Sequence, residues 1–336
     1  MRENEVLPEP IFDTLVAYQK AAALHAAIQL DLFTAIGEGA TTVPALAKRC
    51  ESSERGMRTL CDFLVVERFL AKAEGKYALA DHSAMFLDRR SAAYIGSIST
   101  FLHSPYIRRA FEDVAGAVRK GGTVLDEQGM LAVENPAWVE FARAMAPLAA
   151  GQAESIAHLF ESLDLTPGRI LDIAAGHGRY GIALANRWSQ AQVVFQDWAN
   201  VLTVAEKNAR DAGLAGRYRT LAGDAFEMDL GGPYDTILLT NFLHHFDPPT
   251  CVNFLKKVHA ALTEAGCVVT VESLVNADRV SPPSPAKFSL VMLVSTPQGD
   301  AYTQAEVEHM FAGAGFARTD LHELQNSLQV ALFSYR

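Results

Sequence analysis

The sequence predicts an α/β protein in which a doubly wound, mostly parallel sheet follows a smaller α-helical domain. Three observations support this fold class. Helix-forming segments fill the first half of the chain, strand and helix patterns alternate in the second half, and the last two strands are joined by a short polar turn. Alternating strands and helices predict a parallel sheet. Two strands too close for a crossover helix must instead pair as an antiparallel hairpin.

The composition of the chain argues against a nucleic-acid partner, a membrane partner and a metal site. The 336 residues include 49% hydrophobic ones and carry a net charge of −10, which argues against a broad nucleic-acid or acidic-membrane partner. The N-terminus has no apolar core typical of a signal peptide, and no apolar run reaches about 18 residues. We therefore expect a cytoplasmic protein. The four cysteines lack metal-ligand spacing, so we expect free thiols and no metal site.

The first 90 residues are predicted to form a winged-helix-like dimerisation domain. Apolar residues recur at helical spacing over residues 17–36. Further helices are expected to start at a cap on Thr41 or Thr42 and at a serine cap before Glu54. The stretch "FLAKAEGKYALA" then reads as a hairpin. Three helices followed by a β-wing make this unit.

A winged helix can bind DNA, but the charges of this segment argue against that function. The candidate recognition helix offers phosphate no net attraction, because two arginines are outnumbered by acids: Arg55 and Arg58 against Glu51, Glu54, Asp62 and Glu67. The first helix, rich in Ala and Leu, fits burial against a second subunit better. We therefore expect a homodimer without a nucleic-acid or membrane partner.

Residues 91–163 are predicted to be wholly helical, with residues 104–120 and 136–163 as the clearest pieces. This connector is expected to contribute to an acceptor pocket, although its large apolar residues fit ordinary core packing equally well. The pocket candidates are Trp138, Phe141, Met145, Phe288 and Met292. Pro167–Gly168 breaks the pattern, and the sheet domain is predicted over residues 164–336. Its strands are expected at "RILDIA", "QVVFQ", "YRTLAG", "DTILLTN", "CVVTVES", "FARTDLHEL" and "LQVALFSYR".

The loop after the first of these strands contains glycines that suggest a cofactor. Gly176, Gly178 and Gly181 spell G-x-G-x-x-G, a pattern typical of dinucleotide binding before a helix N-terminus. Asp172, four residues before the first glycine, would be repelled by a pyrophosphate. S-adenosylmethionine (SAM) carries an ammonium and a sulfonium and no phosphate, so a carboxylate here favours SAM. Gly181 then falls in register by coincidence.

Further acids follow at the ends of the next two strands. Asp197 lies about 20 residues beyond the glycines, where a carboxylate can bind the ribose hydroxyls of NAD or of SAM. Asp224 is placed to accept a hydrogen bond from the adenine amine, or else caps a turn. Phe226 is placed to stack on adenine, or else packs in the core. The three acids together with the terminal hairpin favour SAM over NAD(P).

With these residues the chain resembles class I SAM-dependent methyltransferases, and more narrowly the plant caffeic-acid-type and bacterial antibiotic-pathway O-methyltransferases. The resemblance covers nearly the whole chain, because that family pairs a winged-helix dimerisation domain with a Rossmann-like domain. The family's usual loop is D-x-G-x-G-x-G, in which this chain has Ala174 for one glycine. The resemblance implies a SAM site formed by Asp172, Ala174, Gly176, Gly178, Asp197, Trp198, Asp224, Ala225, Phe226 and Asn241.

The resemblance also implies a catalytic group. "NFLHHFDPPTC" stands where the family has a sequence like L-H-D-W-S-D, whose histidine is a general base, and this places the base at His244. His245 is adjacent and leaves that choice open. Glu272 after the fifth strand and Glu306 in "YTQAEVEHMFAGAGF" match the family's supporting glutamates. A carboxylate fixes the tautomer of an imidazole, which can then take the proton of a phenol.

The predicted function is therefore methyl transfer from SAM to a hydroxyl of a small, aromatic molecule. Other functions compatible with parts of the sequence are a SAM-binding family member that catalyses ring closure, decarboxylation or hydroxylation, a NAD(P)-dependent reductase, and a winged-helix regulator that senses SAM. The sequence leaves the acceptor unnamed, and a nitrogen, sulfur or carbon acceptor stays open.

Overall fold

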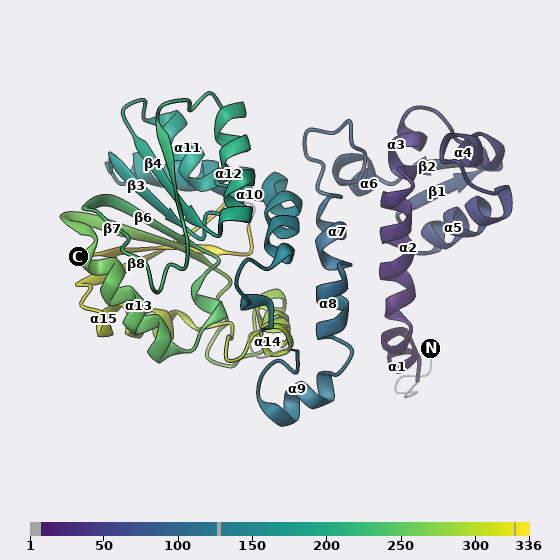
Figure 1. The fold of residues 1–336 in the computed structure, drawn as a ribbon. Helices are drawn as coiled ribbons and strands as arrows, with labels where there is room; N and C mark the ends of the chain where they lie inside the picture. The colour runs from purple at the N-terminus through teal and green to yellow at the C-terminus, as the bar shows by residue number, and fades with distance from the viewer. Residues whose placement is uncertain (1–7, 126–128, 326) are drawn as a thin grey trace. The chain divides into compact units, whose positions relative to one another are not determined.

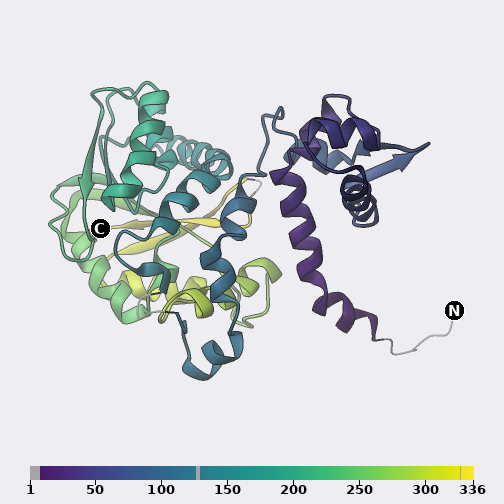
Figure 2. The same cartoon turned by 45° about the vertical axis from the view of Figure 1, so that its right-hand side comes forward.

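The computed structural model describes residues 8–125, 129–325 and 327–336. It divides into two compact units, Met1–His103 and Ser104–Arg336, which are drawn in Figures 1 and 2. No helix among the described residues is long and apolar enough to cross a membrane.

The N-terminal unit consists of helices and one small hairpin (Figure 2). Its core is formed by buried apolar residues from the helices and from Tyr77 on the second hairpin strand. The arrangement agrees with the predicted helical domain with a β-wing. Its elements are α1 (Glu9–Leu15), α2 (Ala17–Gln29), α3 (Leu32–Gly37), α4 (Val43–Arg49), α5 (Glu54–Val66), β1 (Leu70–Ala73), β2 (Lys76–Leu79), α6 (Asp81–Phe86) and α7 (Ile98–Leu102).

Two segments predicted as single helices are each interrupted. The segment 17–36 forms α2 and α3, because Asp31 between them adopts a left-handed backbone with φ of 55°. The segment 104–120 forms α8 (Pro105–Ala110) and α9 (Val114–Lys120), and the Asp113 side chain accepts a hydrogen bond from Gly116 N to start the second helix. The region 91–163 is thus not wholly helical, since turns also precede α7.

The second unit is built on a seven-stranded sheet with the order β5-β4-β3-β6-β7-β9-β8. Strands β3 to β7 run parallel, and β9 pairs antiparallel with both β7 and β8. This confirms the predicted doubly wound sheet with a terminal hairpin. The strands are β3 (Arg169–Ile173), β4 (Gln192–Asp197), β5 (Tyr218–Ala222), β6 (Tyr234–Thr240), β7 (Leu262–Glu272), β8 (Arg318–Glu323) and β9 (Val330–Tyr335).

Helices cover both faces of the sheet. One core joins α10, α11 and α12 to the strands, and another joins α13 and α15 to the opposite face (Figure 1). α14 packs on α8 and α9 through a smaller apolar cluster. The helices are α10 (Pro136–Ser162), α11 (Arg179–Arg187), α12 (Ala199–Asp211), α13 (Pro248–Ala260), α14 (Pro283–Ser295) and α15 (Gln304–Gly313), with 3-10 turns η1 (Gly129–Leu131) and η2 (Leu243–His245).

The central strands are almost continuously apolar, as expected for strands buried on both faces. Buried carboxyl groups interrupt this pattern near the carboxyl ends of three strands, namely at Asp172, Asp197 and Glu272. Open α/β sheets bind their ligands at this edge. The buried acids therefore point to the functional site.

Candidate active site at the carboxyl ends of the strands

The loop after β3 turns sharply before α11. Ala174, Gly176 and Gly178 all have positive φ, of 50°, 55° and 69°. The left-handed conformation costs an L-residue about 1–2 kcal/mol, so Ala174 keeps the loop shape at some expense of stability. The loop brings its backbone close to the ends of β3 and β4, as expected for a cofactor loop.

Gly181 lies outside this loop, in the first turn of α11. A Cβ atom there would stand 2.8 Å from Val193 Cγ1 and 3.0 Å from Asp172 Oδ2. Gly181 is thus explained by the close packing of α11 on the sheet. This accounts for the third glycine of the pattern without a pyrophosphate.

Asp172 is fully buried beneath the loop. Its Oδ2 atom accepts a hydrogen bond from Gly181 N over 3.2 Å, and its Oδ1 atom has no partner among the described residues. Burial, together with the charge of Asp197, raises the pKa of Asp172 to about 8. A nearby cation would favour the ionised carboxylate and satisfy its free oxygen. These properties fit the ammonium end of SAM.

Asp197 ends β4 and joins it to the glycine loop. Its two carboxylate oxygens accept hydrogen bonds from Gly176 N (2.8 Å) and from Trp198 N (2.7 Å). Burial raises the pKa of Asp197 to about 6, and the two backbone donors oppose this rise. Each oxygen has a second lone pair with which it can accept from a ribose hydroxyl. The ring of Trp198 packs in a cluster with Trp138.

The segment after β5 holds the third predicted acid. Asp224 Oδ1 accepts a hydrogen bond from Phe226 N over 2.9 Å, so Asp224 caps a turn here. Phe226 packs against three other aromatic rings, with centroids 4.6 Å from Phe254 and 4.8 Å from Phe246. Ala225 between them is buried. In the structure Asp224 therefore caps a turn and Phe226 packs against core aromatic rings. The side chain of Phe226 is only partly buried.

His244 and Glu272 form a buried pair. His244 lies in η2, directly after β6, and its Nδ1 atom is 2.5 Å from Glu272 Oε2 at the end of β7. The other oxygen of Glu272 accepts hydrogen bonds from the backbone N–H groups of Phe242 and Leu243, at 3.2 and 3.0 Å. An ionised carboxylate can only accept a hydrogen bond, so with Glu272 ionised Nδ1 of His244 is the donor and Nε2 carries the lone pair.

The carboxylate of Glu306 has Thr303 and Arg279 as its partners. Its Oε2 atom accepts hydrogen bonds from the backbone N and the hydroxyl of Thr303, at 2.8 and 3.0 Å, which makes a capping box at the start of α15. Its Oε1 atom pairs with Arg279. Partial burial raises the pKa of Glu306, but the Thr303 hydrogen bonds and the Arg279 charge lower it overall. A threonine three residues before a glutamate was the sequence signal for this cap.

Aromatic side chains gather around the two histidines. His245 lies edge-to-face on His244 with ring centroids 4.3 Å apart, and it stacks on Trp138 at 5.3 Å. Phe141 contacts Trp138, and Phe288 lies 4.9 Å from His244. Burial lowers the pKa of His245 well below its ordinary value, so this imidazole is neutral.

The other two pocket candidates are methionines of α10 and α14. Met145 is half-buried in α10, and Met292 is buried in α14. The structure thus brings Trp138, Phe141 and Phe288 together around the histidines. This gives the carboxyl edge of the sheet an aromatic side as well as an acidic one.

Asn241 follows β6 in a left-handed conformation and is held by residues that the sequence analysis missed. Its N–H donates to Val271 O, and its Oδ1 atom accepts a hydrogen bond from Gln329 Nε2 at 2.5 Å. Gln329 in turn contacts Gln152 of α10. No sequence spacing links residues 177 positions apart, so only the fold could reveal this contact.

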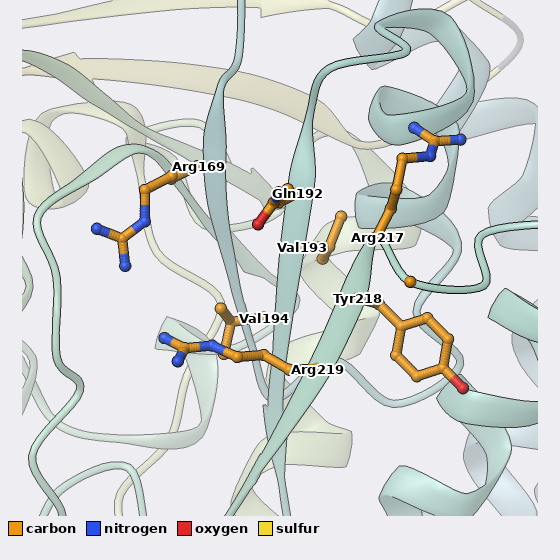
Figure 3. A pocket seen from close by; sticks show the side chains of 8 residues that line it. Arg169, Gln192, Val193, Val194, Arg217, Tyr218 and Arg219 are labelled. Carbon is orange, nitrogen blue, oxygen red and sulfur yellow. The ribbon is translucent and has the colours of Figure 1, made fainter.

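A separate hollow of about 180 Å³ lies at the opposite edge of the sheet (Figure 3). It is placed where β3, β4 and β5 begin, and contains no predicted site residue. Its lining consists of Arg169, Gln192, Val193, Val194, Gly216, Arg217, Tyr218 and Arg219.

Comparisons with known proteins agree with this geometry. A family model described as an O-methyltransferase domain matches residues 135–317, and a second, described as an O-methyltransferase dimerisation domain, matches residues 12–89. The chain is 27% identical over 316 residues to 3-hydroxy-5-methyl-1-naphthoate 3-O-methyltransferase from Streptomyces sahachiroi. The matched region covers 92% of this chain and 89% of that protein.

Solved structures extend the comparison. A crystal structure from Nostoc punctiforme, described as a candidate O-methyltransferase, is 48% identical, has a TM-score of 0.96, and covers 99% of this chain and all of that one. Human N-acetylserotonin methyltransferase, solved with SAM, has a TM-score of 0.86 at 21% identity and covers 100% of this chain and 99% of that one. The second likeness shows a shared fold.

Proposed function

The chain belongs to the O-methyltransferase family and is a SAM-dependent enzyme that methylates a small molecule, and we propose that the accepting hydroxyl is aromatic and loses its proton to His244. The observation that carries this proposal is the buried His244–Glu272 pair at the carboxyl edge of the sheet. It stands next to the loop and acids that suit the cofactor.

Bound SAM supplies a methyl group on a positively charged sulfur. We propose that the cofactor is held by the residues named from the sequence: Asp172, Ala174, Gly176, Gly178, Asp197, Trp198, Asp224, Ala225, Phe226 and Asn241. The unpartnered oxygen of Asp172 suits an ammonium group. The carboxylate of Asp197 suits hydroxyl donors, since each of its oxygens has a second lone pair.

His244 has the arrangement that a general base requires. Since Nδ1 donates to Glu272, Nε2 is free to take the proton of a hydroxyl as that oxygen attacks the methyl carbon. Glu272 then stabilises the positively charged imidazole, while the two backbone donors hold Glu272 in place. General base catalysis of this kind contributes about 10²–10⁴-fold to a rate.

The surroundings of the histidines support an aromatic acceptor. Trp138, Phe141 and Phe288 present flat apolar surfaces next to His244 and His245. Small-molecule sites are mostly apolar, with few polar groups that fix orientation. Two imidazoles among three aromatic rings fit this description, and the relative from Streptomyces sahachiroi is named for a hydroxynaphthoate.

We propose that the protein is a cytoplasmic homodimer. The match to a dimerisation domain supports the assembly. The first helices also expose large apolar side chains that a subunit contact would bury: Ile11, Phe12, Leu15, Val16 and Tyr18. We further propose that residues 1–90 form the dimerisation domain, residues 91–163 the helical connector, and residues 164–336 the methyltransferase domain.

The proposal is tested first by calorimetric titration with SAM, S-adenosylhomocysteine and NAD⁺. We expect micromolar binding of the two adenosyl ligands alone, lost in Asp197→Ala and kept in Asp211→Ala, which removes an exposed acid at the end of the following helix, α12. A screen of phenols with His244→Ala and the exposed control His309→Ala then tests the base. Equal rates for His244→Ala and the unsubstituted enzyme would contradict its role, and SAM consumption without a methylated product would indicate another reaction.

A further inference from the structure

Four polar side chains form a ring beside the active site, in which three hydrogen bonds join successive members and a side-chain interaction of Asn241 with Tyr180 closes it. The Tyr180 hydroxyl donates to Gln152 Oε1 (2.8 Å), and Gln152 Nε2 donates to Gln329 Oε1 (2.9 Å). Gln329 Nε2 donates to Asn241 Oδ1 (2.5 Å). The Asn241 side chain also interacts with Tyr180, and this interaction lowers the pKa of Tyr180 against a larger rise caused by burial.

The ring connects parts of the fold that are distant in sequence. Gln152 lies on α10, Tyr180 lies in the first turn of α11, Asn241 follows β6, and Gln329 precedes β9. Two serine hydroxyls extend the ring, because Ser327 accepts from Gln152 and Ser273 accepts from Gln329. Tyr180 is 2% exposed, and the other three members are partly buried. Hydrogen bonds in such a position are expected to limit movement, because a broken member leaves a polar group unpaired.

Asn241 is the member of the ring that lies next to the turn Leu243–His245, which carries His244. It has a φ of 55°, and its amide oxygen accepts the hydrogen bond from Gln329 Nε2. Asparagine tolerates this conformation better than most residues, but its side chain must be held for the conformation to be unique. The two following N–H groups, of Phe242 and Leu243, bind Glu272, and His244 comes next.

We infer that this ring positions His244, with Gln152, Tyr180 and Gln329 as positioning residues that act through Asn241. The inference rests on the proposed role of His244 as the base. A shift of Asn241 would rotate the turn that carries His244 and separate Nε2 from the acceptor hydroxyl. A misplacement of about 1 Å can reduce a rate about a hundredfold.

The first test observes the imidazole directly and needs no acceptor. Protein labelled with ¹⁵N in histidine is compared by NMR for the unsubstituted enzyme, Gln329→Ala, Gln152→Ala and the control Gln325→Ala, an exposed residue of the same turn. The His244 signals are assigned by their absence in His244→Gln. We expect a single Nδ1-protonated form in the unsubstituted enzyme and in Gln325→Ala, and shifted or exchange-broadened signals in both ring variants. Unchanged His244 signals in the ring variants would overturn the inference.

The second test uses kinetics with a phenol found in the screen. We expect Gln329→Ala to lower kcat about tenfold or more, and by a larger factor than it weakens the binding of S-adenosylhomocysteine, which Asn241 is also proposed to contact. In a His244→Ala background the same substitution should lower kcat less than about twofold, because its effect passes through His244. Equal losses in both backgrounds would overturn the inference.

The two hypotheses fail in different ways. If His244→Ala alone leaves kcat unchanged, the proposed base is wrong, and the NMR comparison still decides whether the ring orients this imidazole. If His244→Ala lowers kcat but Gln329→Ala does not, the base stands and the ring inference falls. Restoration of kcat by Gln329→Glu, which keeps the length of the side chain and an acceptor for Gln152 but lacks the donor to Asn241, would also contradict the inference.

Discussion

The carboxylate of Asp197 accepts a hydrogen bond from the backbone N–H of Gly176, 2.8 Å away and 21 residues earlier in the chain. Its second oxygen accepts from Trp198 N. One side chain therefore holds the glycine loop against the end of β4 and also binds the backbone N–H of Trp198, the residue before α12. The shape of the cofactor loop depends on this acid as much as on its glycines.

Replacement of Asp197 by asparagine should weaken cofactor binding. The amide supplies one acceptor oxygen where the carboxylate supplies two, so its NH₂ group must face one of the two backbone donors. An unmet buried hydrogen bond costs about 1–3 kcal/mol. We expect the calorimetric affinity for S-adenosylhomocysteine to fall about tenfold or more. The same change at Asp211, an exposed acid at the end of α12, should leave it unaltered.

Asp172 should make stability depend on pH in an unusual direction. Its pKa is raised from 3.8 to about 8 in the folded protein, so the folded state holds this proton more tightly than the unfolded chain. The resulting stabilisation is full below about pH 4 and is lost as the pH rises through about 8. We expect the Tm of the cofactor-free protein to fall more between pH 5 and pH 8.5 than the Tm of Asp172→Asn. Parallel pH profiles for the two proteins would contradict this assignment.

Glu272 and Glu306 should respond differently to the same substitution. Glu272→Gln removes the charge that stabilises the protonated imidazole of His244, so we expect kcat to fall about 10²-fold or more with S-adenosylhomocysteine affinity retained. Glu306→Gln weakens a helix cap and an ion pair, which costs about 1 kcal/mol and lowers Tm by a few degrees. Steady-state rates and melting curves of both variants check this contrast. A large loss of kcat in Glu306→Gln would mean that this glutamate does act in catalysis.

The exposed apolar side chains of α1 should control assembly. Phe12 is 62% exposed and Leu15 is 67% exposed. A double substitution Phe12→Asp with Leu15→Asp places two charges where a subunit contact is proposed, and we expect sedimentation to show a shift from dimer to monomer. Val66→Asp is the matched control, because Val66 is 77% exposed on α5 of the same unit. A dimer that survives the double substitution would contradict the proposed contact.

Features encoded by local pattern were predictable from the sequence. The strands of the sheet unit follow from short apolar runs between turn signals, and the terminal hairpin follows from the short turn before Gln329. The acids at strand ends follow from their position in otherwise apolar strands. The cap of Glu306 was also readable, because Thr303 precedes it by three residues.

Features that depend on long-range contact were not predictable. The break between α2 and α3 depends on one left-handed residue, Asp31, within a continuous helical pattern. The contact of Gln152 with Gln329 joins a helix to a hairpin, and a glutamine carries no positional signal in either element. The pairing of His244 with Glu272 was predicted only because a resemblance supplied it, since residues 28 positions apart share no local period.

Gly181 shows how a nucleotide-binding signature can arise from steric demand alone. A β-carbon at this position would overlap Val193, so helix α11 can approach β4 this closely only with glycine. A search for the three-glycine pattern alone would assign this chain to the dinucleotide-binding dehydrogenases. The third glycine of such a pattern can therefore be required by the close packing of a helix on a strand. The acid that precedes the first glycine is the better indicator of the charge of the cofactor.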